Sequence, residues 1–334
     1  MKLKKAYELG ISLLALLWIA SVFWPHKDEA IQTTPEQLVL RIQADWKNLR
    51  SKNLVHGVIA ISQKGKIIFS DGELDKAYPI GSMSKSFTGK LFEQKFQQGQ
   101  LKPSDRVCQW IPSFCHGMLA QITLEQMLTH RSGLPRDLHI WSGVSRSWNQ
   151  STLSDIASEP VDESVLRSAP GTKFLYSNYG FILLSRILEI VDSRSYANQI
   201  AGIAQIAGLQ DASVINASSL ISRQLLVPFI GDGMSLKMVS GVAYSYGAGA
   251  VQTSARDLIQ WLKIYQTSDR KDYGWIQSKE QSYRAYWHNG AYVGLYSLMA
   301  VLPEHDLQIV ILTDNFKFEE FWNKQVTQFQ NYFY

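Results

Sequence analysis

Two pairs of short apolar runs, one early and one late in the chain, predict β-hairpins. Residues 58–61 and 67–69 flank a polar, glycine-containing turn, and residues 295–302 and 307–313 flank a turn that begins with proline. β-rich runs separated by such turns are typical of antiparallel strands. The sequence therefore predicts strands that come from both ends of the chain.

Apolar residues at helical spacing dominate the remaining segments. Residues 35–53 predict an amphipathic helix, whose candidate core contacts are Leu38, Leu40, Ile42, Trp46 and Leu49. Further helical patterns cover residues 82–98, 124–128, 179–191, 255–265 and 318–333.

This order of elements predicts an α/β fold in which one antiparallel sheet, built from both chain ends and flanked by helices, carries an inserted all-helical lobe. We expect a folded unit over residues 37–334, with the α/β lobe at about 37–75 and 280–334 and the helical lobe at about 76–279. A cleft between two such lobes is the natural place for a site.

The N-terminus has the pattern of an export signal. Lys2, Lys4 and Lys5 precede an apolar run over residues 9–24. Bulky residues crowd the end of the run, which favours an uncleaved membrane anchor within residues 1–27, followed by a linker over 28–36. Cleavage, which would secrete the body, and a simple apolar first helix remain open. The positive-inside rule places the body in the periplasm or outside the cell, on a single-pass membrane protein.

Composition excludes some classes of function and leaves others open. The 334 residues are 46% hydrophobic and 19% charged with a net charge of +4, and no dense basic stripe indicates nucleic-acid binding. The two cysteines, Cys108 and Cys115, are too few for a zinc site with His116 alone. They can form a short-loop disulfide or remain two thiols. Neither a metal nor an organic cofactor is predicted, and the oligomeric state is open.

The strongest chemical candidate is the Ser-x-x-Lys formed by Ser82 and Lys85 at the start of a predicted helix. Spacing of three residues places the amine beside the hydroxyl on one helix face. A serine hydroxyl needs a neighbouring base, and lysine serves when burial or charge lowers its pKa. Serine at a helix start is also a common N-cap, so this alternative stands beside the catalytic one. A second match at Ser268 and Lys271 lies in a charged stretch and indicates exposed surface.

A second candidate is Tyr176-Ser177-Asn178, which follows a Pro-Gly turn. An extended step places the phenol and the amide on one side, where the phenol can relay a proton and the amide can bind a carbonyl. Tyr176 can also be an ordinary structural residue whose amphipathic side chain forms part of the wall of the cleft. Another Tyr-x-Asn at Tyr196 falls within a helical pattern, where its two side chains would not align.

The third candidate, His288-Asn289-Gly290-Ala291, precedes the last strand pair and predicts a strand edge that faces the cleft. His288 could orient a carboxylate or assist proton movement, and Gly290 would allow close approach of a substrate backbone. A His-Asn-Gly sequence is also common in simple turns.

In this order, the three motifs resemble those of the serine penicillin-recognising enzymes, the group of class C β-lactamases, D-alanyl-D-alanine carboxypeptidases and related esterases. Residues 128–135, 170–172 and 247–251 resemble its connecting segments, and the likeness covers roughly residues 55–315. The resemblance implies a β-lactamase-like fold.

The resemblance also implies a role for each motif residue. Ser82 would be acylated, and Lys85 and Tyr176 would share the proton transfers, either one as the base. Substrate binding would fall to Asn178, His288, Gly290 and Ala291, with the backbone N–H groups of Ser82 and Ala291 as the oxyanion hole.

The expected function is a serine acyl-enzyme hydrolase that acts on D-Ala-type peptides, amides or esters at the cell envelope, with a small-molecule or peptidoglycan-derived substrate. A β-lactamase is the alternative within the enzymes, and an idle penicillin- or peptidoglycan-binding sensor is the alternative outside them. Histidine at position 288, where class C β-lactamases carry lysine, and a short exported body favour the peptidase or esterase.

Overall fold

The computed structural model describes residues 34–137, 153–215, 245–265, 273–280, 283–292 and 295–313. The predicted anchor, most of the predicted linker, the second Ser-x-x-Lys at Ser268 and the predicted helix at 318–333 lie outside these ranges. Within them, no helix is both long and apolar enough to cross a bilayer.

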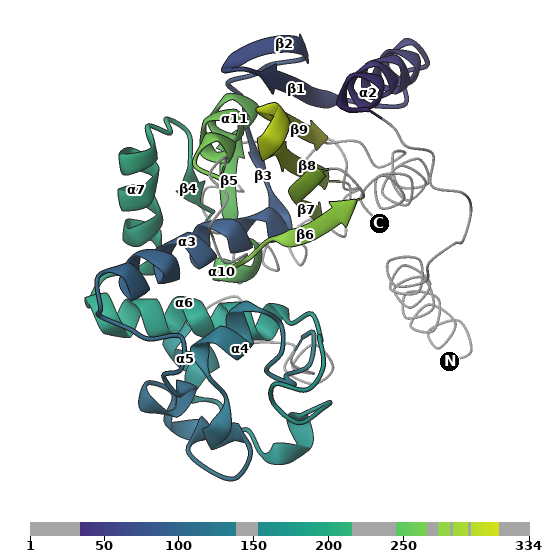
Figure 1. The fold of residues 1–334 in the computed structure, drawn as a ribbon. Helices are drawn as coiled ribbons and strands as arrows, with labels where there is room; N and C mark the ends of the chain where they lie inside the picture. Colours follow the sequence, from purple (N-terminus) through teal and green to yellow (C-terminus); the bar gives the residue numbers. More distant parts are fainter. Residues whose placement is uncertain are drawn as a thin grey trace, which may run out of the picture.

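A six-stranded antiparallel sheet organises one half of the molecule (Figure 1). Its strand order is β2-β1-β9-β8-β7-β6. The strands are β1 (Gly57–Gln63), β2 (Lys66–Asp71), β6 (Ile276–Glu280), β7 (Tyr283–Tyr292), β8 (Leu295–Leu302) and β9 (Leu307–Thr313). Because β1 pairs with both β2 and β9, the early and late hairpins join in one sheet. The sheet predicted from both chain ends is thus confirmed.

Helix α2 (Pro35–Ser51) covers one face of this sheet. It begins with a capping box between Thr34 and Gln37, which satisfies two backbone N–H groups at the helix start. Its buried side chains pack with the alternate residues of the strands, such as Ile59 and Ile61. The prediction that Leu40 joins this core is wrong, because Leu40 lies on the outer helix face and is 65% exposed.

Helix α11 (Ala255–Lys263) packs on the other face, against β1, β8 and β9. The remaining alternate residues of those strands, among them Val58 and Met299, belong to this second core. Strands β8 and β9 are buried along their whole length because both of their faces are covered. The sheet therefore carries α2 on one side and α11 on the other, as Figure 1 shows.

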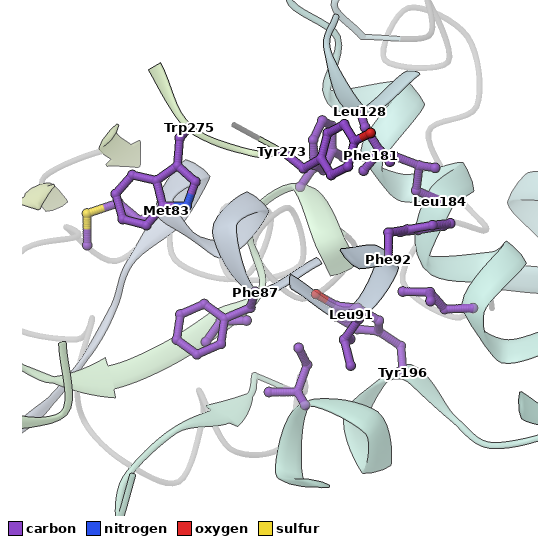
Figure 2. Packing of buried hydrophobic residues seen from close by; sticks show 14 of the residues in the cluster. Met83, Phe87, Leu91, Phe92, Leu128, Phe181, Leu184, Tyr196, Tyr273 and Trp275 are labelled. Atoms are coloured by element: carbon purple, nitrogen blue, oxygen red, sulfur yellow. The ribbon is translucent and has the colours of Figure 1, made fainter. Parts of the chain in front are cut away.

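Helix α3 (Ser84–Gln97) lies between the strands and the helical region (Figure 1). Figure 2 shows its Phe87, Leu91 and Phe92 surrounded by side chains from several other segments. Phe87 also stacks on Trp261 of α11, with 4.0 Å between the ring centroids. Since α3 is held from several directions, its first turn is a rigid support for polar groups.

The remaining elements are a small sheet and the other helices. A small sheet of order β3-β5-β4 joins three distant segments. Its strands are β3 (Ala77–Pro79), β4 (Ser213–Val214) and β5 (Val251–Ser254). The other α-helices are α4 (Leu124–Leu128), α5 (Leu153–Ser158), α6 (Asn178–Asp192), α7 (Tyr196–Ala207) and α10 (Tyr246–Gly249). Short 3₁₀ helices lie at Gly81–Met83, Val107–Gln109, Pro112–Phe114, Leu119–Gln121, Glu163–Val165 and Pro303–His305.

Of the two states that the sequence left open for the cysteines, the structure contains the disulfide between Cys108 and Cys115. The predicted α/β fold class is confirmed. The lobe boundaries near residues 75 and 280 stay predictions, and α11, from within the range expected for the helical lobe, contacts the sheet.

Candidate active site

Ser82 lies in the 3₁₀ turn that leads into α3, and Lys85 lies in the first turn of that helix. Gly81, just before the serine, has φ of +55°, a left-handed conformation that favours glycine. A Cβ at Gly81 would also lie 3.1 Å from the backbone nitrogen of Ala291. The turn therefore packs directly against the end of β7.

The N-cap alternative for Ser82 finds no support in this turn. Met83 is the N-cap residue of α3 and Ile80 that of the preceding 3₁₀ turn, and neither makes a side-chain cap hydrogen bond. The Ser82 hydroxyl instead lies 3.4 Å from the Lys85 Nζ. It also hydrogen bonds to Tyr176, so the serine belongs to a polar side-chain cluster.

The Lys85 amine is fully buried and is held by three oxygen atoms. Its Nζ donates to the Ala248 carbonyl oxygen at 2.7 Å and to Asn178 Oδ1 at 2.8 Å, and the third oxygen is Ser82 Oγ. Burial disfavours the ammonium form and holds the pKa of Lys85 well below its ordinary value. Arg136 lowers the pKa of Lys85 further by charge repulsion, while Asp137 acts in the opposite direction.

The second motif reaches the same amine from the start of α6. Ser177 is the N-cap of that helix in an extended conformation, and its hydroxyl accepts from the Gly180 N–H at 2.9 Å. Residues on either side of an extended residue point the same way. Asn178 accordingly bonds Lys85, and the Tyr176 ring centroid lies 4.8 Å from its Nζ.

Burial raises the pKa of the Tyr176 phenol to about 12, although the hydrogen bond between Tyr176 and Ser82 acts to lower it. The phenol therefore keeps its proton at neutral pH. The ring stacks on His130, with 4.4 Å between centroids. His130 is itself oriented because its Nδ1 accepts from the Ser177 N–H at 3.1 Å. Burial, then repulsion by Lys85, holds the pKa of His130 well below its ordinary value.

The third motif lies on β7, in the part that extends beyond the pairing with β6. His288 is buried, and its Nδ1 lies 2.6 Å from the carbonyl oxygen of Asn289. Because a carbonyl only accepts, Nδ1 donates here and Nε2 of the neutral ring is an acceptor. Burial and the nearby Lys85 lower the pKa of His288 to about 3, so the ring is uncharged at neutral pH.

Gly290 has a structural reason to be glycine that the sequence did not indicate. A Cβ there would lie 2.1 Å from the carbonyl oxygen of Ile80, which also accepts from Ser297 Oγ at 2.9 Å. The close approach at Gly290 is thus to the chain's own backbone. It brings the exposed Ala291 next to the turn that carries Ser82.

The three predicted motifs therefore meet around the Lys85 amine, and the site contains further residues that sequence reasoning missed. These are His130, Arg136, Asp137 and Ala248. Asp137 Oδ1 accepts from Asn178 Nδ2 at 2.9 Å, and the Arg136 guanidinium carbon lies 5.4 Å from the Tyr176 ring centroid. The only sequence signal for these residues was their position. They lie within or just after segments that resemble the connecting loops of the penicillin-recognising enzymes.

The other candidates are placed elsewhere. Tyr196 lies in α7, where its phenol contacts Thr88 at 2.8 Å, so that Tyr-x-Asn copy is helical as predicted. Over the described ranges, no cluster of His, Cys, Asp and Glu has the makeup of a metal site.

Comparison with known proteins decides the family. The model of the family described as "Beta-lactamase" matches residues 42–327, most of the chain. The chain belongs to the β-lactamase family. This confirms the resemblance found in the sequence and the predicted class of enzyme, a serine hydrolase of this family.

The individual relatives match this chain at low sequence identity and over only part of their own length. "Protein flp" of Staphylococcus aureus (strain MW2) is 29% identical over 168 residues, which cover 46% of this chain and 33% of that protein. "D-alanyl-D-alanine-carboxypeptidase/endopeptidase AmpH" of Escherichia coli (strain K12) is 23% identical over 210 residues, 59% of this chain and 51% of that protein. The match thus spans only a third to a half of the length of these relatives.

Solved structures share the fold at low identity. A D-amino acid amidase from Ochrobactrum anthropi SV3, in complex with L-phenylalanine amide, has a TM-score of 0.66 and 18% identity, covering 88% of this chain and 97% of its own. A β-lactamase/D-alanine carboxypeptidase from Yersinia pestis has a TM-score of 0.65 and 16% identity, covering 88% and 99%. These two proteins are similar to the chain in fold.

Proposed function

We propose that the chain hydrolyses D-alanyl peptides, or related amides and esters of D-amino acids, through an acyl-enzyme on Ser82. One observation carries this proposal. The Lys85 amine lies beside the Ser82 hydroxyl while two acceptor oxygens, of Ala248 and Asn178, hold its other side.

This arrangement favours Lys85 over Tyr176 as the base. A neutral amine has two N–H groups and one lone pair, and the two acceptor oxygens engage both N–H groups. The lone pair is then directed to Ser82 Oγ, at 3.4 Å, a separation that can shorten when substrate binds. The lowered pKa of Lys85 increases the amine fraction, and the Tyr176 pKa of about 12 disfavours a phenolate.

The proposed reaction then runs in two halves. Ser82 Oγ attacks the substrate carbonyl carbon as its proton moves to Lys85, and the backbone N–H groups of Ser82 and Ala291 stabilise the oxyanion. The bond to the leaving group breaks as Tyr176 gives that group its proton and regains one from Lys85. In the second half, water attacks the ester carbonyl and the bond to Ser82 Oγ breaks. One proton of that water passes to Ser82 Oγ, which restores the serine and releases the acid.

The substrate class is inferred from the third motif and from the named relatives. The uncharged His288 offers a hydrogen-bond acceptor at the position where class C β-lactamases carry a cationic lysine. One relative is named a D-alanyl-D-alanine carboxypeptidase/endopeptidase, and a protein of the same fold is a D-amino acid amidase. Both names point to amides of D-amino acids.

A substrate panel tests this proposal. The purified chain is given D-Ala-D-Ala peptides, D-amino acid amides, p-nitrophenyl esters and nitrocefin, with L-amino acid amides as the matched control. We expect turnover of a D-substrate or ester, and only a stoichiometric burst with nitrocefin. Sustained nitrocefin turnover as the fastest reaction would identify a β-lactamase instead, and no acylation by any compound would favour the idle sensor.

We also propose that an N-terminal anchor holds the body at the outer side of the cell membrane. Its support is the lysine-rich start before the apolar run at residues 9–24. Fractionation of cells that express the full chain should recover it at full mass with the membranes, accessible to protease from outside. A shortened soluble form outside the cytoplasm would indicate cleavage, and a full-length cytosolic form would contradict the proposal.

A further inference from the structure

Asp137 lies at the end of a chain of side chains that leads to the catalytic serine. Its Oδ1 accepts from Asn178 Nδ2 at 2.9 Å. On the other side of the same amide, Asn178 Oδ1 accepts from Lys85 Nζ at 2.8 Å, and Lys85 lies 3.4 Å from Ser82 Oγ. Two residues, Asn178 and Lys85, thus connect the 43% exposed Asp137 side chain with the Ser82 hydroxyl.

The direction of these hydrogen bonds depends on which end of the Asn178 amide faces Lys85. An amide can turn by half a rotation and exchange its oxygen and nitrogen, which differ little in size. An ionised carboxylate can only accept, so Asp137 requires the N–H end of the amide on its own side. The oxygen end must then face Lys85.

The opposite orientation would block the proposed base. Asn178 Nδ2 would face Lys85 and donate to the lone pair that a neutral amine needs for the Ser82 proton. The amide oxygen would meanwhile face the Asp137 carboxylate, two acceptors in contact with no hydrogen between them. The carboxylate therefore disfavours the one orientation of Asn178 that consumes the lone pair.

We infer that Asp137 is a positioning residue for acylation, which holds the Asn178 amide so that Lys85 keeps its lone pair for Ser82. This inference rests on the proposed function. Asn178 Nδ2 carries two N–H groups, so it can donate to Asp137 and to a substrate carbonyl at once. The role of Asp137 is thus compatible with substrate binding by Asn178.

A competing explanation places the effect of Asp137 in its charge. The carboxylate lies 3.6 Å from the Arg136 guanidinium, and both groups act on Lys85 by their charges. Within the described part of the chain, the other titratable groups around Lys85 are Tyr176, His130 and His288. A charge effect and an orienting hydrogen bond make different demands on the side chain at position 137, because only the second is met by a neutral acceptor.

The test is a double-mutant cycle on the acylation rate constant, measured by stopped flow with a p-nitrophenyl ester or a fluorophosphonate. We expect Asp137→Ala to lower the rate about tenfold, with little change in ester KM, and Asp137→Asn to stay within about threefold of wild type. In the Asn178→Ala background, Asp137→Ala should lower the acylation rate by less than about twofold, since the amide that Asp137 orients is gone. Asp162→Ala is the matched control, because that exposed carboxylate accepts hydrogen bonds from nearby Ser164.

Each other result overturns the inference. If Asp137→Asn is as slow as Asp137→Ala, the charge acts and the hydrogen bond does not. If the two losses multiply in the double variant, Asp137 acts by a route that does not include Asn178. If Asp137→Ala does not fold, Asp137→Ser replaces it in the test, because a serine side chain is too short to reach the Asn178 amide. A wild-type chain that no probe acylates would refute the proposed function itself, whereas acylation unchanged in every Asp137 variant would refute this inference alone.

Discussion

Lys85 and His288 are two buried bases in the same site, and they differ in their hydrogen-bond partners. Both lose affinity for a proton because burial disfavours the charged form. The Lys85 amine faces two acceptor oxygens and the Ser82 hydroxyl, whereas the His288 ring donates from Nδ1 to the Asn289 carbonyl on its own strand. Lys85 is therefore placed to exchange a proton with the serine, and His288 to remain a neutral hydrogen-bonding group.

The difference shows that a lowered pKa alone does not identify a catalytic base. His130 is a third buried base whose pKa is lowered, yet its Nδ1 is occupied by a backbone N–H and its ring supports Tyr176. Only Lys85 combines a lowered pKa with contact to the hydroxyl that must lose its proton. Geometry separates the three groups, as general-base catalysis requires.

Removal of the Lys85 amine should give the largest contrast between the two bases. We expect Lys85→Ala to slow acylation by about 10²- to 10⁴-fold, the usual contribution of a general base. The measurement is the rate of ester or fluorophosphonate acylation. Lys90→Ala, on the same helix but paired with Glu93, is the matched control and should acylate at the wild-type rate. A Lys85→Ala rate within about threefold of wild type would indicate that Tyr176 or water is the base instead.

The pH dependence of acylation should follow Lys85 and not His288. The base must be neutral, so kcat/KM should rise with pH through the lowered pKa of Lys85 and fall about tenfold per unit below it. His288, with a pKa of about 3, stays neutral above pH 5 and should add no inflection there. A profile from pH 5 to 10 for wild type and His288→Gln checks this. Loss of the acid limb in His288→Gln would show that the histidine titrates.

Truncation of His288 should have a smaller effect than truncation of Lys85. His288→Ala removes one neutral hydrogen-bonding group and should reduce kcat/KM by about 2- to 12-fold. The acid limb of the pH profile should remain in place. A loss as large as that of Lys85→Ala would contradict the separation of roles between the two bases.

A positive charge at position 288 should change the preference between substrates, and this is the smallest of the expected effects. His288→Lys would add a cation at the third motif, and we expect a severalfold gain for substrates whose leaving group carries a carboxylate, relative to the matched carboxamides. The ratio of kcat/KM for D-Ala-D-Ala peptides with free and amidated C-termini measures this. An unchanged ratio would show that position 288 does not contact the leaving group.

Much of this account was predictable from the sequence, and the reasons are local. The hairpins around residues 63–66 and 303–306 followed from short apolar runs on either side of a turn, and the Ser82, Tyr176 and His288 motifs from short spacings. Leu40 was misjudged because an apolar residue near a helical stripe need not lie on its buried side.

The rest of the site depends on contacts between distant segments. Asp137 meets Asn178 across 41 positions of sequence, and the Ala248 carbonyl meets Lys85 across 163. The close contact of Gly290 with the Ile80 carbonyl could not be predicted either, because Ile80 lies more than 200 positions away and a backbone carbonyl carries no side-chain signal. A backbone atom brought in by tertiary packing leaves no residue type for a sequence pattern to detect.

Intact-protein mass spectrometry after exposure to a fluorophosphonate, followed by peptide mapping, tests the covalent role of Ser82 most directly. The wild-type chain should gain the mass of one adduct on Ser82, and so should the control Ser51→Ala, which removes an exposed hydroxyl that donates to the Asn48 carbonyl. Ser82→Ala should gain none. An adduct on the Ser82→Ala chain at the wild-type rate, or one that maps to another residue in the wild type, would contradict the account.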